Sequence, residues 1–270
     1  MGSLLGWLGG CIGRYLSQPV EIDHLTPPTE PRGLLETLQP GDVLLVEGNS
    51  RVSGIIKYLT QSTWSHAALF VGDRLSTIVG APNPAFVEAD IVDGVRAVTA
   101  DAYAGLPTRI CRPAGIAPED LQRVLDFAIT RIGHQYDLRN VIDLARYLFP
   151  TPPVPQRFRR RMLSLGSGDP TRAICSTLIA QAFQSVRYPI LPRTVRIAGD
   201  DPDCPECVEE VMQLRHFSLF APRDFDVSPY FEIVKPGIAR AKAHRQLAWI
   251  DHGRASRFTG PHRSHRAPMQ

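Results

Sequence analysis

The chain has 270 residues, of which 43% are hydrophobic and 21% are charged, and its formal net charge is +3. This balance is typical of a folded globular protein and excludes a wholly disordered chain. Five cysteines are too few, and odd in number, for a dense disulfide framework, which favours a reducing compartment.

The positive charge is concentrated at the C-terminal end. Residues 235–270 carry eight Lys and Arg against one acid, a net +7 that leaves a net −4 for the rest of the chain. We expect residues 236–270 to form a basic, disordered tail. An arm for nucleic acid or anionic lipid is the alternative, but no aromatic-rich basic face favours RNA or DNA.

Residues 1–20 begin with an apolar segment, "MGSLLGWLGGCIGRYLSQ". The segment is short for a transmembrane helix and lacks the basic start of a signal peptide. Three alternatives stay open: a helix packed on the domain, an amphipathic segment lying on a membrane, and a lipoprotein processed at "LGGC". We expect the protein in the cytoplasm or at the inner face of a membrane.

Residues 21–235 show an α+β order of elements in one domain. Predicted strands cover residues 42–48, 65–72, 85–92, 109–113 and the end of 219–235. Residues 94–104 predict a strand with a short turn. Predicted helices cover residues 51–61, 117–133, 138–149 and the segment that follows Cys175. The continuously apolar strand 65–72 is expected to be central. A long loop is expected over 150–173, and an irregular stretch follows Tyr188.

Cys175 stands where a loop becomes a helix, in "TRAICSTLIAQAF". Leu178, Ile179 and Phe183 follow on one helix face, so core packing is one interpretation of the cysteine. The other is a nucleophile, because the dipole and free N–H groups of a helix N-terminus favour a thiolate and can stabilise an oxyanion. A thiol that titrates near ~8.5 would also need a base at neutral pH.

His66 is the candidate base, because it opens the apolar strand and a strand end can present an imidazole at a cleft. A core histidine bonded to the backbone is the alternative. A catalytic histidine needs a partner that fixes its tautomer, and Glu88 on the next strand is the best candidate. Asp90 and Asp93 are rival partners.

Two further groups carry weaker signals. Tyr136 in "GHQYDLRN" could donate its hydroxyl to an oxyanion, or only pack in the core. Cys204 and Cys207 in "CPEC" have the spacing of half a zinc site, but no second pair follows, which favours a surface pair. We therefore expect no metal and no cofactor, and no phosphate-binding glycine loop occurs.

Taken in order, these segments resemble a known family. "PGDVLLV", "WSHAALFVG", "FVEA", "GHQYD" and "ICSTLIAQAF" follow one another as in circularly permuted papain-like cysteine hydrolases. The set is similar to the YiiX/YebB-like branch of the NlpC superfamily, over about residues 35–235. The resemblance implies an antiparallel sheet packed against helices, with the nucleophile at a helix N-terminus.

By this resemblance Cys175 is the nucleophile, His66 the general base and Glu88 the polar third member. Tyr136 would be an oxyanion donor beside the Cys175 N–H. The implied reaction cleaves an amide or ester bond through an acyl-thioester intermediate. An amidase or peptidase acting on cell-wall peptide or an acyl-amino-acid is the expected class.

Two alternative functions stay open. One is a lipid-directed thiol acyltransferase or phospholipase-like enzyme at an anionic membrane surface, which the apolar N-terminus and an arginine cluster favour. That cluster comprises Arg157, Arg159, Arg160 and Arg161. The other is a non-enzymatic binding module at a membrane surface with a structural thiol, against which the family order of the site residues argues. The loop over 150–173 is longer than in the shortest family members, and we expect it to overhang the cleft.

Overall fold

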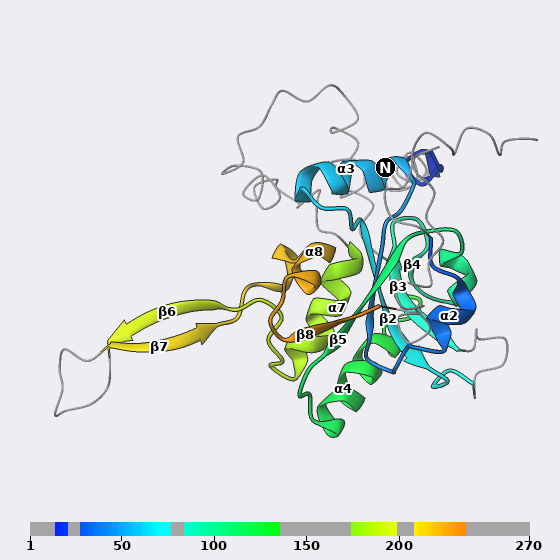
Figure 1. Ribbon diagram of the computed structural model, residues 1–270. Coiled ribbons are helices and arrows are strands. Elements are labelled where there is room, and N and C mark those ends of the chain that lie inside the picture. Colours follow the sequence, from blue (N-terminus) through cyan, green and yellow to red (C-terminus); the bar gives the residue numbers. More distant parts are fainter. Residues whose placement is uncertain (1–13, 21–27, 77–83, 136–173, 199–207, 236–270) are drawn as a thin grey trace, which may run out of the picture. The chain divides into compact units, whose positions relative to one another are not determined.

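The computed structural model describes residues 14–20, 28–76, 84–135, 174–198 and 208–235 (Figure 1). The chain divides into two units, Met1–Pro236 and Gly237–Gln270, and every described residue lies in the first. Several predictions fall outside the described residues and stay predictions. They concern residues 1–13, the helix 138–149, the loop 150–173, Cys204, Cys207 and the tail 236–270.

A six-stranded antiparallel sheet, in the order β4-β3-β2-β1-β5-β8, forms the centre of the described part. Its strands are β1 (Val43–Val46), β2 (His66–Gly72), β3 (Ala85–Asp90), β4 (Gly94–Val98), β5 (Thr108–Pro113) and β8 (Phe231–Val234). The apolar strand β2 lies inside the sheet between β1 and β3, as predicted, and is buried beyond its first residue.

Helices cover both faces of this sheet (Figure 1). The described part contains the helices α2 (Pro31–Leu35), α3 (Arg51–Thr60), α4 (Pro118–Ile129), α7 (Ile174–Ser185) and α8 (Pro222–Asp226), and the 3-10 turns η1 (Ala100–Tyr103) and η3 (Phe217–Leu219). On one face α4 and α7 pack around a core that includes Leu69 and Phe183. On the other, α2 and η1 pack around Leu44 and Phe86. The sheet therefore separates two apolar cores.

The mixed α+β prediction is confirmed by this architecture. The predicted helix at 51–61 is α3, which starts after Ser50, whose side-chain oxygen accepts the Ser53 N–H at 3.2 Å. The helix predicted over 117–133 is shorter: α4 ends at Ile129, and turns lead to Gly133 at φ +90°. Gly133 does lie beyond the helix, but three residues in turns separate it from Ile129, the last helical residue.

The prediction of an irregular stretch after Tyr188 is wrong in part. β6 (Arg193–Ala198) and β7 (Val208–Gln213) pair as an antiparallel, separate two-stranded sheet. Val195 lies opposite Val211, which is the β-branched pairing that stabilises such ladders. The signal is weak in the sequence because charged residues interrupt short apolar runs in both strands and Pro192 directly precedes the first.

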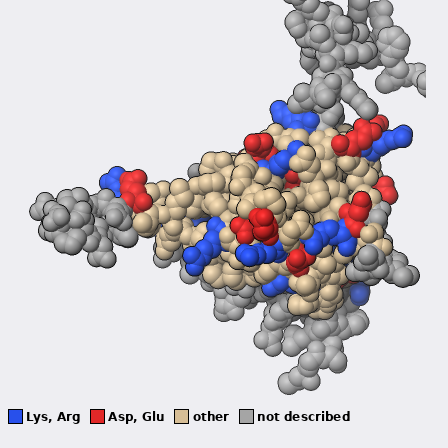
Figure 2. Space-filling view, turned by 90° about the horizontal axis from the view of Figure 1, so that it is seen from below, with Lys and Arg blue, Asp and Glu red and all other residues tan. Residues whose placement is uncertain are grey.

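The face of the described part that Figure 2 shows carries charges of both signs. In the view of Figure 2, acidic and basic side chains lie intermixed, without a broad patch of one sign. Within the described ranges, no helix is both long and apolar enough to cross a membrane.

Candidate functional site

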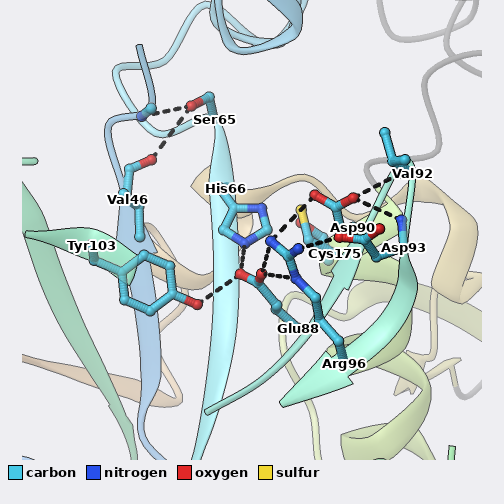
Figure 3. Close-up of polar contacts among 12 residues, drawn as sticks. Val46, Ser65, His66, Glu88, Asp90, Val92, Asp93, Arg96, Tyr103 and Cys175 are labelled. Atoms are coloured by element: carbon cyan, nitrogen blue, oxygen red, sulfur yellow. Dashed lines mark hydrogen bonds and ion pairs between the residues drawn. The ribbon is translucent and has the colours of Figure 1, made fainter. Parts of the chain in front are cut away.

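Three of the four predicted site residues lie together at the N-terminal end of strand β2 (Figure 3). Cys175 lies in the first turn of α7, His66 is the first residue of β2, and Glu88 lies in the neighbouring β3. Nε2 of His66 lies 2.6 Å from Oε2 of Glu88. Cys175 lies close enough to His66 for each group to shift the pKa of the other, and Nδ1 is the ring nitrogen of His66 that its contact with Glu88 leaves open. The fourth residue, Tyr136, lies outside the described residues.

The helix that carries Cys175 is fixed by its apolar face. Leu178, Ile179 and Phe183 are fully buried in the core between α7 and the sheet, as their helical spacing predicts. Cys175 itself is 4% exposed. The helix face below Cys175 is therefore core, as predicted, and the thiol at its end lies beside the His66 imidazole. The role of Cys175 as a nucleophile stays a prediction.

The position of His66 is fixed by the residue before it. Ser65 is buried, its N–H donates to the Val46 carbonyl at 3.1 Å, and its Oγ accepts the Gly48 N–H at 2.9 Å (Figure 3). A Cβ at Gly48 would collide with Oγ of Ser53 and come within 3.0 Å of Oγ of Ser65. This close packing requires glycine at position 48 and sets where β2 begins.

A second contact ties the same turn to α8. The Trp64 indole N–H donates to Oδ2 of Asp226 at 3.1 Å, and Arg109 donates to Oδ1 of that carboxylate at 2.7 Å. The Arg109 guanidinium also lies over the Trp64 ring, 4.9 Å from its centroid. The turn that leads into His66 is thus held from both sides.

Glu88 is buried and receives donors at both carboxylate oxygens. Oε2 accepts the Tyr103 hydroxyl at 2.7 Å as well as His66, and Oε1 accepts Nε of Arg96 at 2.9 Å (Figure 3). Nη2 of Arg96 lies 2.8 Å from the same Oε1. Because an ionised carboxylate only accepts hydrogen bonds, Nε2 of His66 carries a proton and Nδ1 is the nitrogen that exchanges one with the thiol.

The rival carboxylates contact Arg96 in the structure. Oδ1 of Asp90 accepts the N–H groups of Val92 and Asp93 at 2.7 and 2.9 Å, and Oδ2 lies 3.6 Å from Arg96. Asp93 forms an ion pair with Arg96. Among the predicted partners, Glu88 is therefore the one whose carboxylate bonds to His66.

The electrostatics favour charged forms of all three groups. Burial alone would raise the pKa of the Cys175 thiol, but His66 and the N–H of Ala67 outweigh it and hold the pKa below its ordinary value. Burial would lower the pKa of His66, yet Glu88 and Cys175 raise it well above its usual value. Burial opposes ionisation of Glu88, but its bond to His66 and its other donors lower its pKa to about 2. The arrangement favours a thiolate beside an imidazolium.

Arg96 and Tyr103 are the site residues that the sequence interpretation missed. A signal for Arg96 exists: β3 and β4 form a hairpin whose register places Glu88 directly opposite Arg96. A short turn with Asp and Gly between two predicted strands indicates that pairing. Tyr103 lies in η1, which reaches Glu88 from outside the hairpin, and no spacing in the sequence indicates that contact.

The other described free thiol has a different setting. Cys111 lies in β5, is fully buried in the core, and has no basic side chain bonded to its sulfur in the described structure. Burial, as the largest cause, raises its pKa far above that of an ordinary thiol. Across the residues that the structure describes, no group of three or more His, Cys, Asp or Glu side chains could hold a metal ion.

Comparisons with known proteins give weak structural likeness alone. No family model matches the chain, and no curated protein matches it. Among solved structures, the metalloprotein YiiX of Escherichia coli O157:H7, a DUF1105 protein, is 17% identical over 74% of this chain and 98% of its own, with a TM-score of 0.44. A likeness of this size does not bear on the family, the fold or the activity of this chain.

Proposed function

We propose that this protein is a cysteine hydrolase that cleaves an amide or ester bond through an acyl-thioester on Cys175. One observation carries the proposal: a buried thiol lies close enough to His66 for each group to shift the pKa of the other, and Nε2 of that histidine is bonded to a buried carboxylate. Nucleophile, base and orienting group in that order are what covalent acyl transfer requires. A packing cysteine such as Cys111 needs none of these partners.

The steps follow from the two nitrogens of His66. Nδ1 takes the thiol proton, and the thiolate attacks the carbonyl carbon of the substrate. The tetrahedral oxyanion would be stabilised by the N–H groups in the first turn of α7, where the helix dipole is positive. Nδ1 then protonates the leaving amine or alcohol, and water hydrolyses the thioester. Throughout, Nε2 donates to Glu88, which keeps the ring orientation.

We propose further that the domain is a circularly permuted papain-like fold of the NlpC superfamily. In support, the strand with the histidine precedes the helix with the cysteine along the chain, the strand lies in an antiparallel sheet, and the helix packs against that sheet. The remaining predicted oxyanion donor, Tyr136, is part of this proposal.

The test is capture of the acyl-enzyme. The full chain is incubated with a panel of peptide amides, acyl-amino-acid esters and acyl lipids, quenched in acid, and analysed by intact mass and peptide mapping. We expect an acyl adduct on Cys175 and turnover with at least one member, both lost in Cys175→Ala. The peptide and lipid members separate the two substrate classes that the sequence predicts.

Cys111→Ala is the matched control, because it removes the other described buried free thiol. It should keep both the adduct and turnover. Turnover that survives in Cys175→Ala, or an adduct that maps to another residue, would contradict the proposal. The absence of any adduct and any turnover across the panel would instead favour the binding-module alternative.

A further inference from the structure

We propose that Tyr103 and Arg96 are positioning residues that hold Glu88 ionised and aim its Oε2 at His66, so that the Cys175–His66 pair stays charged in mild acid. This inference rests on the proposed function, since it concerns how the nucleophile of that reaction is kept ready. Neither residue is hydrogen-bonded to the thiol in the described structure; both act through Glu88.

The two carboxylate oxygens of Glu88 have different hydrogen-bond donors. Oε1 receives two contacts from Arg96, at 2.9 and 2.8 Å, and Oε2 receives His66 at 2.6 Å and Tyr103 at 2.7 Å. An ionised carboxylate has about four acceptor sites, so these four contacts fill them. A rotation of the carboxylate would break several bonds at once, which keeps Oε2 directed at the imidazole.

Tyr103 is itself held rigidly by its packing. Its ring packs edge-on against Phe86 with 5.3 Å between centroids, and it is buried in the core of that sheet face. The backbone carbonyl of Tyr103 accepts the Leu106 N–H at 3.1 Å, which closes the turn after η1. Burial, followed by the charge of Glu88, raises the pKa of Tyr103 well above its ordinary value, so the hydroxyl keeps its proton and donates it.

Arg96 is held by the hairpin on which it lies. It stands directly opposite Glu88 in the β3–β4 register, and Gly94 begins β4 at φ +74°. A Cβ at Gly94 would collide with the His134 carbonyl oxygen, and that same oxygen accepts the Val95 N–H at 2.9 Å. The start of β4 is therefore clamped to the turn after α4, and Arg96 reaches Glu88 from a fixed backbone.

The charges around Glu88 come from each element packed on it. His66 faces it from β2, Arg96 from β4 and Tyr103 from η1, while Cys175 lies beyond His66 on α7. Asp90 and Asp93 are the acidic groups nearby, and both are directed at Arg96. They anchor the guanidinium on its outer side, whereas its inner side, with Nε, faces Glu88 (Figure 3).

The sign of the effect follows from the contacts. Hydrogen bonds from Tyr103 and the charge of Arg96 both stabilise the carboxylate, so removal of either one raises the pKa of Glu88. On acidification, Glu88 is then protonated at a higher pH. The neutral acid stabilises the imidazolium less, and the thiolate that depends on the imidazolium is lost earlier. The rate of Cys175 alkylation falls at low pH, and we call this fall the acid limb. In either variant the acid limb should lie at a higher pH than in the wild type.

The experiment measures the rate of Cys175 alkylation by iodoacetamide from pH 3 to 8 in the full chain, with the modified residue located by mass spectrometry. Tyr103→Phe should move the acid limb up by about half to one pH unit, as expected for loss of one hydrogen bond. Arg96→Gln should move it by at least as much. Arg96→Lys keeps the cation and should give an intermediate shift.

Two controls remove the same chemical groups elsewhere. Tyr188→Phe deletes a hydroxyl that donates to the Ala114 and Tyr230 carbonyls at 2.7 and 2.6 Å, and Arg112→Gln deletes the guanidinium bound to Asp42. Both should lower the thermal stability without moving the acid limb. Thermal unfolding of every variant at each pH identifies any rate change that comes from unfolding.

The outcomes separate this inference from the proposed function. If wild-type Cys175 reacts rapidly in mild acid but the limb is unmoved in folded Tyr103→Phe and Arg96→Lys, the positioning role is wrong and the hydrolase proposal stands. An equal shift in the control variants also overturns the role. If wild-type Cys175 reacts no faster than Cys111, the proposed function itself fails, and this inference fails with it.

Discussion

Two buried carboxylates in this domain are each paired with an arginine on a neighbouring strand, and they differ in what their second oxygen does. Asp42 is bound through both oxygens by Arg112, at 2.9 and 2.7 Å, and its other contact is the Gln39 N–H. Glu88 is bound by Arg96 through one oxygen only, which leaves the other for a histidine and a tyrosine.

The difference shows how one ion-pair chemistry serves two purposes. The bidentate pair at Asp42 also includes an Arg112 bond to the Thr37 carbonyl at 2.9 Å, so all its polar contacts are structural and link the chain before β1 to β5. At Glu88 the arginine contacts one oxygen only, so it stabilises the negative charge and leaves the other oxygen free to bind His66. The position of the arginine, and not its presence, decides whether a buried carboxylate can act on a base.

The largest effect on stability is expected from Asp42→Asn. Asp42 is 1% exposed, and the variant leaves Arg112 without its carboxylate, so the free energy of unfolding should fall by about 3 kcal/mol. Urea denaturation measures this loss. The acid limb of Cys175 alkylation should stay at its wild-type pH, and a shift of that limb would remove the distinction between the two pairs.

The next effect concerns acid stability and uses Glu88→Gln. The pKa of Glu88 is lowered from 4.5 to about 2, so its contribution to stability is complete above pH 4.5 and is lost as the pH falls to about 2. The slope of the unfolding free energy against pH in that window should be shallower in the variant, by up to about 1.4 kcal/mol per pH unit. Urea titrations at four or five pH values measure it. Parallel curves for the two proteins would argue against an ionised Glu88.

The smallest effect is expected at a third arginine–carboxylate pair, on the surface of the β6–β7 hairpin. Arg196 donates to Glu210 at 3.0 Å, but their side chains are 75% and 58% exposed. Water screens such a pair, so Arg196→Gln should change the free energy of unfolding by less than about 0.5 kcal/mol. A loss comparable to that of Asp42→Asn would mean that burial does not set the ranking of the three pairs.

The sequence was sufficient for the parts of the fold that depend on local pattern. The apolar run of β2 predicts a central strand, and the helical spacing after Cys175 predicts the buried face of α7, as the structure has them. The β6–β7 hairpin was missed, because its stability comes from pairing between strands that are separated by nine residues outside the described ranges.

At the site, the sequence identified residues whose type is chemically unusual in its position and missed those that support them. A histidine at the start of an apolar strand and a cysteine at the start of a helix are noticeable alone. Arg96 could have been expected opposite Glu88 from the β3–β4 hairpin, whereas Tyr103 is ordinary in its segment and contacts Glu88 only because the chain brings η1 against it. Such second contacts depend on tertiary packing, which a single sequence does not encode at any fixed spacing.

The backbone N–H of Ala67 lowers the pKa of the Cys175 thiol, and this has a consequence for how the site can be studied. The donor belongs to the main chain, so every side-chain replacement at position 67 except proline retains it. A mutational scan, or a comparison of natural variants, would therefore record Ala67 only as a small, fully buried residue. Its effect on the thiolate would become visible through chemical synthesis, with an ester in place of that one amide.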